Sequence, residues 1–401
     1  MSIRLPKGLV RRADCFGRVR FPLETCMPLL IRLGCLGALV ATLAAATGGN
    51  ASAGADASPS ATLSVPGLSR DLAQQGWLLL FDGQTTFGWH VDGQTAIRDG
   101  IWTLAPKASA ATTSRFGNHW DLVLEVEGPL RMYLPSGLIL EHQRAARDRL
   151  EVRCRGKDTH YEGASFTPVR AEQLPAAAER GHIVVAAVGP EPARIQHLRL
   201  LPCQLQPLFN GRNLEGWTVN TADARRQQAR FSVTAAGELL VENGPGDLVS
   251  TRTADNFLLQ FQCRTLGRHL NGGVFFRCIP GQYQNGYEVQ IHNGYKDKDR
   301  SQPLDYGTGA IYRRVAARRV VSNDDEWFTV TLIADGRHLA TWVDGFPVVD
   351  WHDPRPPHDN PRQGFRAAAG PFSIQAHDPT TRLLFRRIAY APLDPPLRQH
   401  P

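Results

Sequence analysis

Two short segments of this 401-residue chain repeat each other, and the repeat restricts the possible folds more than any other feature. Leu80-Phe81-Asp82-Gly83 is followed by Gly88-Trp89, and Leu208-Phe209-Asn210-Gly211 is followed at the same offset by Gly216-Trp217. Equivalent residues lie 128 positions apart, a spacing that suits one sandwich-sized unit. We predict that one unit was duplicated, so a polar pattern present in only one copy indicates where the chemistry lies.

The first 53 residues have the pattern of a targeting segment. They hold seven basic and two acidic residues, and the apolar stretch over 33–46 is too short to span a bilayer. Ala51-Ser52-Ala53 offers an A-x-A cleavage site, although a retained membrane anchor is the alternative. Cleavage there lowers the formal net charge from +7 to about +2, so the basic composition does not indicate nucleic acid binding. We expect an extracytoplasmic protein, periplasmic or secreted, whose mature chain has no membrane span.

The rest of the chain has the pattern of an all-β protein. Short apolar or alternating runs recur between turn residues, and little helix is predicted. Two β-sandwiches in tandem fit this pattern, and one larger sheet assembly is the alternative. The predicted segments are a flexible linker over 54–67, a first sandwich over 68–202, a second sandwich over 206–393 and a tail over 394–401.

Four cysteines follow the predicted cleavage site: Cys154, Cys203, Cys263 and Cys278. In an exported chain they could form two disulfides, and Cys263 and Cys278 lie on runs that could be neighbouring strands. Buried free thiols are the alternative, since four cysteines in a chain of this length do not make a disulfide framework.

The run over 287–292 is the most informative for function. Successive side chains of a strand face opposite sides, so Glu288, Gln290 and His292 share one face while three apolar side chains share the other. A carboxyl, an amide and an imidazole are thereby aligned on one surface.

Two further runs repeat this logic. In 373–377, Gln375 and His377 face outward, and Arg277 can do so at the end of another predicted strand. If these strands are neighbours, their polar side chains form one surface suited to a ligand. The alternative is an ordinary solvated outer face, which antiparallel sheets commonly have.

Aromatic side chains, Tyr312 among them, are concentrated in the second half, and flat rings beside hydrogen-bonding groups suit sugar faces. The loop over 293–309 is the predicted rim of the site. Its Asp297, Asp299 and Asp305 could ligate calcium but match no calcium-loop spacing, so we expect no metal and no cofactor. Motifs for zinc proteases, serine hydrolases and phosphate-binding loops are absent from the sequence.

An ordered series of short motifs runs through the second predicted sandwich. It comprises residues 208–217, 271–277, 287–291, 309–312, 326–327, 343–345, 374–377 and 385–388. In this order the motifs resemble the 3-keto-disaccharide hydrolase domain family, formerly a domain of unknown function. The resemblance implies a concanavalin A-like jelly-roll sandwich whose concave sheet binds sugar, and hydrolysis of 3-keto-glycosides.

A ketone at C3 of a sugar acidifies the proton on C2. A base can then remove this proton while an acid protonates the departing oxygen on C1, and water adds afterwards. We predict that Glu288 and His377 are the acid/base pair, with His292 in reserve, and that Arg277 or Gln290 holds the enolate or a hydroxyl. The residues predicted to bind the substrate are Arg277, Gln290, Gln375, Asn271 and Tyr312.

The first half resembles the family only near its ends. Aligning 150–155 with 287–292 retains Glu151 but places Arg153 and Arg155 where the second copy has an amide and an imidazole. We therefore predict a degenerate first sandwich that packs, scaffolds or binds. For the whole protein, the alternative to a glycoside-cleaving enzyme is a non-catalytic carbohydrate-binding or cell-surface adhesion module, which has little need for converging acid/base groups.

Overall fold

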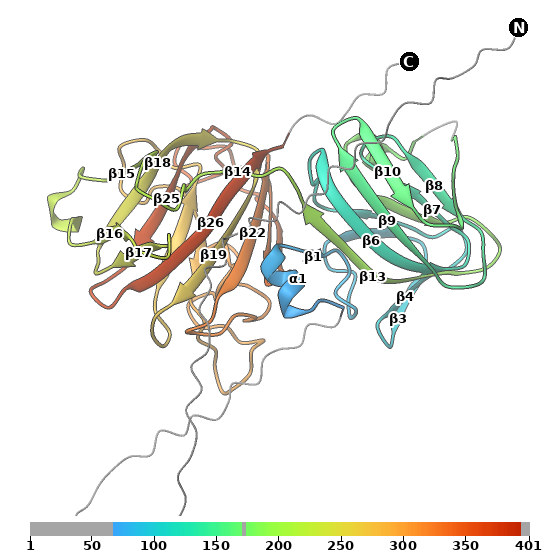
Figure 1. Cartoon of the computed structure of the whole chain (residues 1–401), viewed down its shortest axis with the longest axis horizontal. Coiled ribbons are helices and arrows are strands. Elements are labelled where there is room, and N and C mark those ends of the chain that lie inside the picture. The colour runs from blue at the N-terminus through green and yellow to red at the C-terminus, as the bar shows by residue number, and fades with distance from the viewer. Residues whose placement is uncertain (1–66, 171–173, 394–401) are drawn as a thin grey trace, which may run out of the picture. The chain divides into compact units, whose positions relative to one another are not determined.

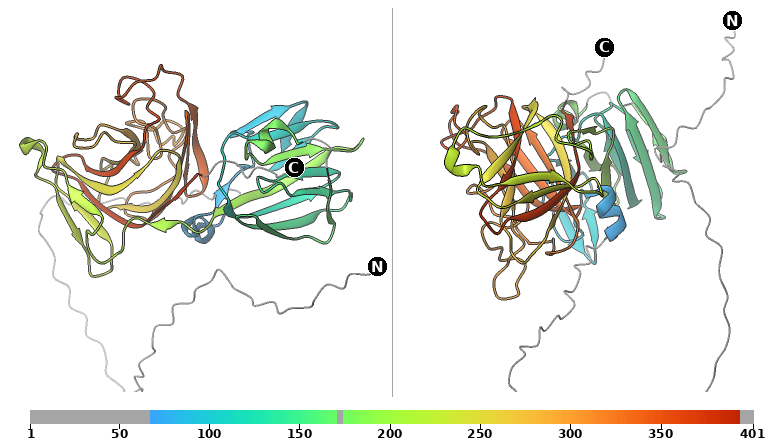
Figure 2. Two further views of the ribbon diagram at one scale, coloured as in Figure 1. Left: turned by 90° about the horizontal axis from the view of Figure 1, so that it is seen from above. Right: turned by 60° about the vertical axis from the view of Figure 1, so that its left-hand side comes forward.

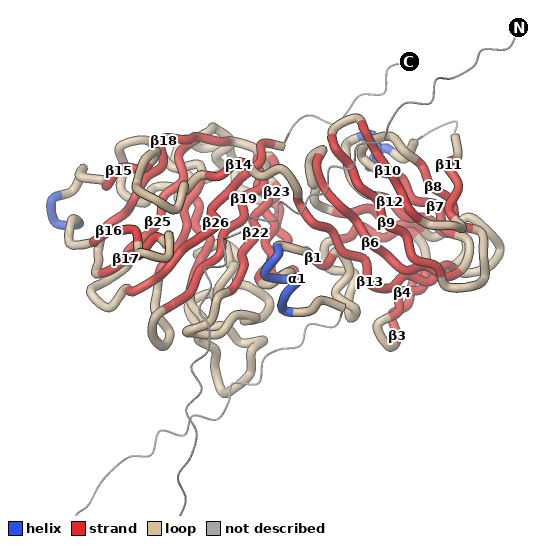
Figure 3. Tube along the Cα trace, viewed as in Figure 1, coloured by secondary structure: helices blue, strands red, loops and turns tan. Residues whose placement is uncertain are grey.

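The computed structural model describes residues 67–170 and 174–393 (Figure 1). In these residues strands predominate and helices are short, so the all-β prediction is confirmed (Figure 3). No helix among them is long and apolar enough to cross a bilayer. The predicted signal segment and almost all of the predicted linker lie outside the described residues, as does the predicted tail.

The first sandwich pairs two antiparallel sheets. Its seven-stranded sheet contains, in order, β10 (Asp158–Glu162), β9 (Asp148–Arg155), β6 (His119–Glu127), β13 (Ala193–Pro202), β4 (Ile101–Leu104) and β3 (Thr95–Arg98), with β1 (Leu78–Leu79) on β13. Its six-stranded sheet contains β11 (Phe166–Pro168), β8 (Ile139–His142), β7 (Leu130–Tyr133), β12 (Val184–Ala187), β5 (Ser109–Thr112) and β2 (Trp89–Asp92). The helices of this half are α1 (Arg70–Gln75) and α2 (Ala176–Glu179).

The second sandwich also pairs two antiparallel sheets (Figure 2). Its eight-stranded sheet contains, in order, β16 (Arg230–Val233), β17 (Leu239–Glu242), β26 (Arg382–Pro392), β19 (Phe257–Thr265), β22 (Phe328–Asp335), β23 (His338–Val343) and β24 (Phe346–His352), with β14 (Gln206–Pro207) on β26. Its five-stranded sheet contains β15 (Trp217–Val219), β18 (Gly246–Ala254), β25 (Gly370–Ala376), β20 (Gly272–Phe276) and β21 (Tyr287–Ile291). A short 3-10 helix, η1 (Ala224–Arg226), lies between β15 and β16.

The repeated motif has the same structural role in both sandwiches. In each copy the tryptophan indole donates a hydrogen bond to the carbonyl of the leucine nine residues earlier, Trp89 to Leu80 at 2.5 Å and Trp217 to Leu208 at 2.8 Å. The carboxylate or amide at the third motif position accepts two backbone N–H groups of the turn that follows. The motif therefore ties the start of the second strand, β2 or β15, to the segment that directly follows the first strand, β1 or β14, across the intervening turn.

Strand order shows which parts of the two sandwiches correspond. β9 lies beside β6 as β22 lies beside β19, and β8 lies beside β7 as β21 lies beside β20. Residues 150–155 belong to β9, so the alignment of this run with 287–292 is wrong. The two runs share an alternating strand pattern, which does not determine the sheet to which a strand belongs.

The six-stranded sheet of the first sandwich carries an apolar cluster on strands that correspond to β25, β20 and β21. Val184, Tyr133 and Ile139 are adjacent across β12, β7 and β8, and they form a small apolar cluster with residues of α2. In the next row, Arg131 and Glu141 form an ion pair with each other at 2.5 Å. Apolar packing against α2 and the ion pair between Arg131 and Glu141 therefore occupy this part of the sheet.

Cys263 and Cys278 do not lie on neighbouring strands, contrary to the sequence prediction. Cys263 is in β19 of the eight-stranded sheet, whereas Cys278 follows β20 of the five-stranded sheet. Both are buried free thiols, and burial raises the pKa of each well above the usual value for cysteine.

Candidate functional site

A cavity of about 400 Å³ lies over the five-stranded sheet of the second sandwich. Phe275, Glu288, Gln290 and Gln375 of β20, β21 and β25 line its floor. The loops after β21 and β24, which extend beyond the strands in Figure 2, contribute Tyr312 and other wall residues. All lining residues belong to the second sandwich.

Strand register places the polar side chains in two rows on this face. Across β25, β20 and β21, Gln375 is opposite Gly273, which is opposite Gln290. In the next row Phe275 is opposite Glu288. The alternate residues of these strands face the core between the sheets, so the predicted alternation of 287–292 holds within β21. The prediction that the strands are neighbours is also confirmed.

Glu288 is a buried carboxyl group, with only 8% of the residue exposed. Burial raises its pKa to about 8, and the nearby Asp305 adds to the rise while the positive charges of Arg362 and Arg313 oppose it. The group is therefore largely protonated at neutral pH, and a small change in its surroundings shifts its charge. The solvated face considered from the sequence is excluded at this position.

Gly273 leaves the space that the Glu288 carboxyl occupies. A β-carbon on Gly273 would lie 2.4 Å from Oε1 of Glu288, closer than any ordinary contact. We expect Gly273→Ala to displace the carboxyl and to lower turnover about 10²-fold, because misplacing a reacting group by about 1 Å has effects of this size. The measurement is kcat on a 3-keto-glucoside, in the single variant and combined with Glu288→Gln. If Gly273 acts through Glu288, the combined variant is no slower than Glu288→Gln alone; an additive loss would contradict this.

Two glutamine amides on the floor are held by their nitrogen atoms. Gln290 Nε2 donates to Oδ2 of Asp305 at 2.8 Å, and Asn271 Nδ2 donates to the same oxygen at 2.7 Å. Gln375 Nε2 donates to Oε1 of Gln284 at 3.0 Å. The Oε1 atoms of Gln290 and Gln375 are buried without a hydrogen-bond partner among the described residues. Since buried acceptors are normally satisfied, these two oxygens suit hydroxyl donors of a ligand.

His377 has its imidazole oriented by a carboxylate. Its Nδ1 lies 2.7 Å from Oδ2 of Asp378, and its backbone N–H donates to Oγ1 of Thr381 at 3.0 Å. Among the described residues no hydrogen bond involves Nε2, and the side chain is 44% exposed. A carboxylate on one ring nitrogen leaves the other nitrogen to exchange protons with a ligand.

The structure brings together most of the residues singled out from the sequence. Those lining the cavity are Glu288, His377, Gln290, Gln375, Asn271 and Tyr312. His292 is not among them. β21 ends at Ile291, and the His292 ring lies near His269, with a centroid distance of 5.9 Å.

Arg277 does not face the cavity, and its predicted substrate contact is corrected. It is fully buried and follows the last residue of β20, with a left-handed φ of 48° that ends the strand alternation. Its guanidinium donates to the carbonyl groups of Asp255 at 2.7 Å and Gly336 at 2.8 Å, and to that of Arg366 at 3.2 Å. Arg277 therefore joins backbone segments of the domain.

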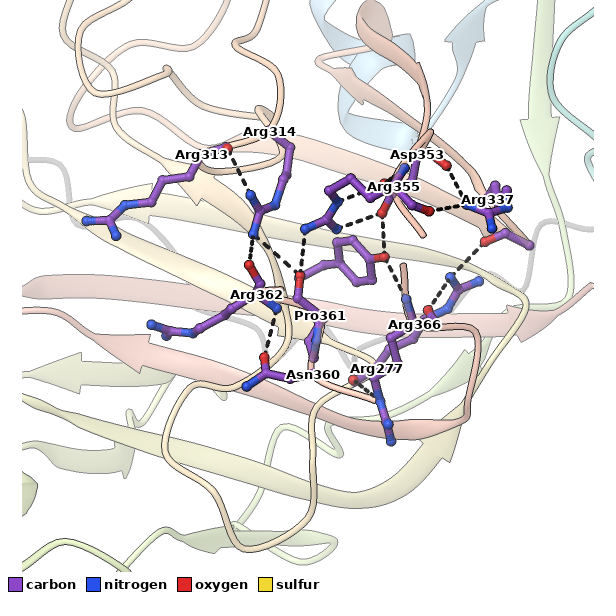
Figure 4. A network of polar contacts seen from close by, with 12 residues as sticks. Arg277, Arg313, Arg314, Arg337, Asp353, Arg355, Asn360, Pro361, Arg362 and Arg366 are labelled. Carbon is purple, nitrogen blue, oxygen red and sulfur yellow. Dashed lines mark hydrogen bonds and ion pairs between the residues drawn. The ribbon is translucent and has the colours of Figure 1, made fainter. Parts of the chain in front are cut away.

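One wall of the cavity is held by an arginine-rich network (Figure 4). Arg355 pairs with Asp353 at 2.7 Å, and Asp353 also accepts a hydrogen bond from the Tyr287 hydroxyl at 2.7 Å. Arg314 donates to the carbonyl of Arg362 at 2.8 Å, which joins the loop after β21 to the loop after β24. These contacts give the loops a defined position above the floor.

Several residues of the site were not found from the sequence. Asp305 was considered only as a calcium ligand, yet it accepts hydrogen bonds from two cavity amides. Asp297, another aspartate considered as a calcium ligand, forms an ion pair with Lys296 at 3.8 Å. No group of three His, Cys, Asp or Glu residues in the described ranges is arranged to hold a metal ion. The arginines of the wall lie in loops, where no side-chain periodicity indicates their direction.

Fold and site together define a β-sandwich domain with a polar, ligand-sized cavity over one sheet. Residues 204–390, which make up nearly all of the second sandwich, match the sequence model of the 3-keto-alpha-glucoside-1,2-lyase-like domain. The match confirms the resemblance seen in the motifs. Comparison with curated proteins found no match.

Solved structures of similar fold align with about half of the chain. Two are Parabacteroides distasonis proteins provisionally described as glycosyl hydrolases: one is 22% identical, with 48% of this chain and 100% of that one covered and a TM-score of 0.38. The other is 17% identical, with 47% and 93% covered and a TM-score of 0.37. The carbohydrate-binding module CBM66 of Bacillus subtilis is 16% identical, with 44% and 94% covered and a TM-score of 0.31.

Proposed function

We propose that the second sandwich cleaves 3-keto-glycosides by elimination followed by addition of water. The observation that carries this proposal is that the buried, protonated Glu288 and the carboxylate-oriented His377 line the same cavity. The description of the matched family, a 3-keto-alpha-glucoside-1,2-lyase-like domain, supports the same substrate class. In this proposal the first sandwich, over 68–202, is non-catalytic, and the protein acts outside the cytoplasm after removal of residues 1–53.

His377 acts as the base and Glu288 as the acid. The imidazole Nε2 takes the proton from C2, the electron pair moves to form the enolate of the C3 ketone, and the C1–O bond then breaks as Glu288 protonates the leaving oxygen. The product is a sugar with a double bond between C1 and C2, to which water adds a hydroxyl at C1 and a proton at C2. A raised pKa keeps the Glu288 proton available at neutral pH, which fits the acid role.

The same groups favour an enzyme over a carbohydrate-binding module. A lectin gains nothing from a buried carboxyl group with a shifted pKa that shares a cavity with an imidazole, whereas acid/base catalysis uses such groups. A mechanism with two catalytic carboxylates is disfavoured, because Glu288 is the single acidic residue among the described residues that line the cavity.

Isotope incorporation tests the proposed reaction. In D2O, elimination and hydration place deuterium at C2 of the released 3-keto sugar, whereas direct hydrolysis of the C1–O bond retains the original hydrogen. We expect deuterium at C2 from the earliest turnovers of a 3-keto-glucoside, measured by mass spectrometry or NMR. The free product incubated in D2O without enzyme gives the rate of uncatalysed exchange. Early product without deuterium would contradict the mechanism, and absence of turnover would contradict the function.

A further inference from the structure

The cavity walls carry an excess of positive charge. Four arginines line the cavity: Arg226, Arg313, Arg314 and Arg362. The single acidic lining residue among those described is Glu288, whose raised pKa leaves it largely uncharged at neutral pH. A cavity for a neutral sugar needs directional hydrogen bonds, and four guanidinium groups exceed that need.

Two of these arginines already have structural partners. Arg314 is directed toward the carbonyl groups of Pro361 at 3.4 Å and Arg362 at 2.8 Å. Arg226 lies 4.4 Å from the ring centroid of Tyr283 and 3.4 Å from a carboxylate oxygen of Asp223. Their charges are partly used in holding the wall.

Arg313 and Arg362 have fewer such contacts, although the Arg313 guanidinium lies 5.4 Å from the ring centroid of Tyr312. Both are exposed, and neither forms an ion pair with a carboxylate among the described residues. In Figure 4 both side chains extend away from the hydrogen-bonded network and toward the same side. Arg362 donates one hydrogen bond, to the Gln284 carbonyl at 2.6 Å, which leaves most of its five N–H donors available.

The reaction proposed above does not account for two further cations that have no carboxylate partner among the described residues. Its enolate carries one transient negative charge, and Arg226 and Arg314 already contribute positive potential at the cavity. A permanent oxyanion on the ligand would use the remaining donors, because the guanidinium fork matches carboxylate and sulfate oxygens in geometry and charge.

We propose that this cavity selects acidic glycosides, with Arg313 and Arg362 binding a carboxylate or sulfate group on the sugar. The inference rests on the proposed function and adds a preference among its substrates: 3-keto-glycosides that carry such a group bind more tightly, and neutral 3-keto-glycosides are still turned over. Specificity then arises from charge at the rim, while Gln290 and Gln375 accept hydroxyl groups at the floor.

Equilibrium binding tests this inference without catalysis. Both anomers of methyl glucoside, methyl glucuronide and methyl glucoside 6-sulfate are titrated by calorimetry at low salt into the full chain. We expect the glucuronide, the sulfate or both to bind at least tenfold more tightly than the neutral glucoside, with the difference reduced at high salt. Preference for one of the two identifies the oxyanion.

Charge-removing variants test the two residues. Arg313→Gln and Arg362→Gln are each expected to weaken acidic ligand binding about tenfold, the effect of losing one charge-assisted hydrogen bond, and to weaken neutral glucoside binding by a much smaller factor. Arg212→Gln removes the same charge from an exposed position outside the cavity and is expected to change neither. Thermal melting checks that each variant is folded.

Equal affinity for neutral and acidic glycosides would overturn the inference, as would a preference that survives in both cavity variants. Either result leaves the D2O experiment unaffected, because that experiment uses a neutral 3-keto-glucoside. A result that refutes the preference for acidic glycosides can therefore be told apart from a result that refutes the proposed reaction.

Discussion

Replacement of Glu288 by glutamine is expected to lower kcat for a 3-keto-glucoside by about 10²–10⁴-fold, the usual contribution of a positioned general acid. The amide nearly preserves the shape of the carboxyl group, so the cavity floor remains intact, but it has no acidic proton for the leaving oxygen. The measurement is the rate of product release at saturating substrate. Glu151→Gln is the matched control, because Glu151 lies in β9 of the first sandwich and is expected to have no effect.

The pH dependence gives a second readout of the same substitution. If Glu288 is the acid, wild-type kcat falls as the pH rises through about 8, where the carboxyl loses its proton. The residual rate of Glu288→Gln lacks this decline. Full activity in the variant, or a wild-type rate that increases through pH 8, would contradict the acid role.

Stability provides an independent check on the raised pKa. The Glu288 pKa in the folded state lies above that of an unfolded glutamate, so between about pH 5 and 8 the folded state binds more protons. This group therefore lowers the free energy of unfolding by about 1.4 kcal/mol per pH unit as the pH rises through that window. Glu288→Gln removes this contribution, so its stability relative to the wild type increases from pH 5 to pH 8.

Much of the second sandwich could be predicted from local patterns. The alternation in 287–291 correctly separated core from cavity residues, because the period of a strand is fixed by its backbone. The repeated motif located the beginning of each sandwich, between its first and second strands, since its indole and turn contacts are local. The sequence analysis had to assume that β20, β21 and β25 are neighbours, because no local pattern shows which strands pair with each other.

The errors have a common physical origin. Alternation holds only while the backbone remains extended, and it ends at the left-handed Arg277, while His292 lies just beyond the end of β21 and outside the cavity lining. Strand-like runs also carry no information on sheet membership, which is why 150–155 was aligned with the wrong strand. Arg362 and Asp305 lie in loops, so only the folded chain shows that they contact or surround the cavity.

Arg277 gives the second large effect, and it concerns stability. Arg277→Met is expected to lower the free energy of unfolding by about 3 kcal/mol or more, because several buried carbonyl groups lose their donor together. Arg277→Lys retains the charge without the planar fork, so we expect an intermediate loss. The measurement is the midpoint of denaturant unfolding at neutral pH. The surface control is Arg382→Met, which removes an exposed ion pair and is expected to change stability by only about 0.5 kcal/mol.

The two variants of Arg277 also distinguish the structural role that its position indicates from the substrate-binding role predicted from the sequence. A residue that held the enolate or a sugar hydroxyl would affect kcat or KM in the lysine variant while leaving the unfolding midpoint unchanged. A residue that joins the segments at Asp255, Gly336 and Arg366 would shift the midpoint first, and activity would follow the folded fraction. A lysine variant with wild-type stability and impaired turnover would support the predicted substrate contact of Arg277. The observed burial instead predicts lower stability, with normal turnover by the folded fraction.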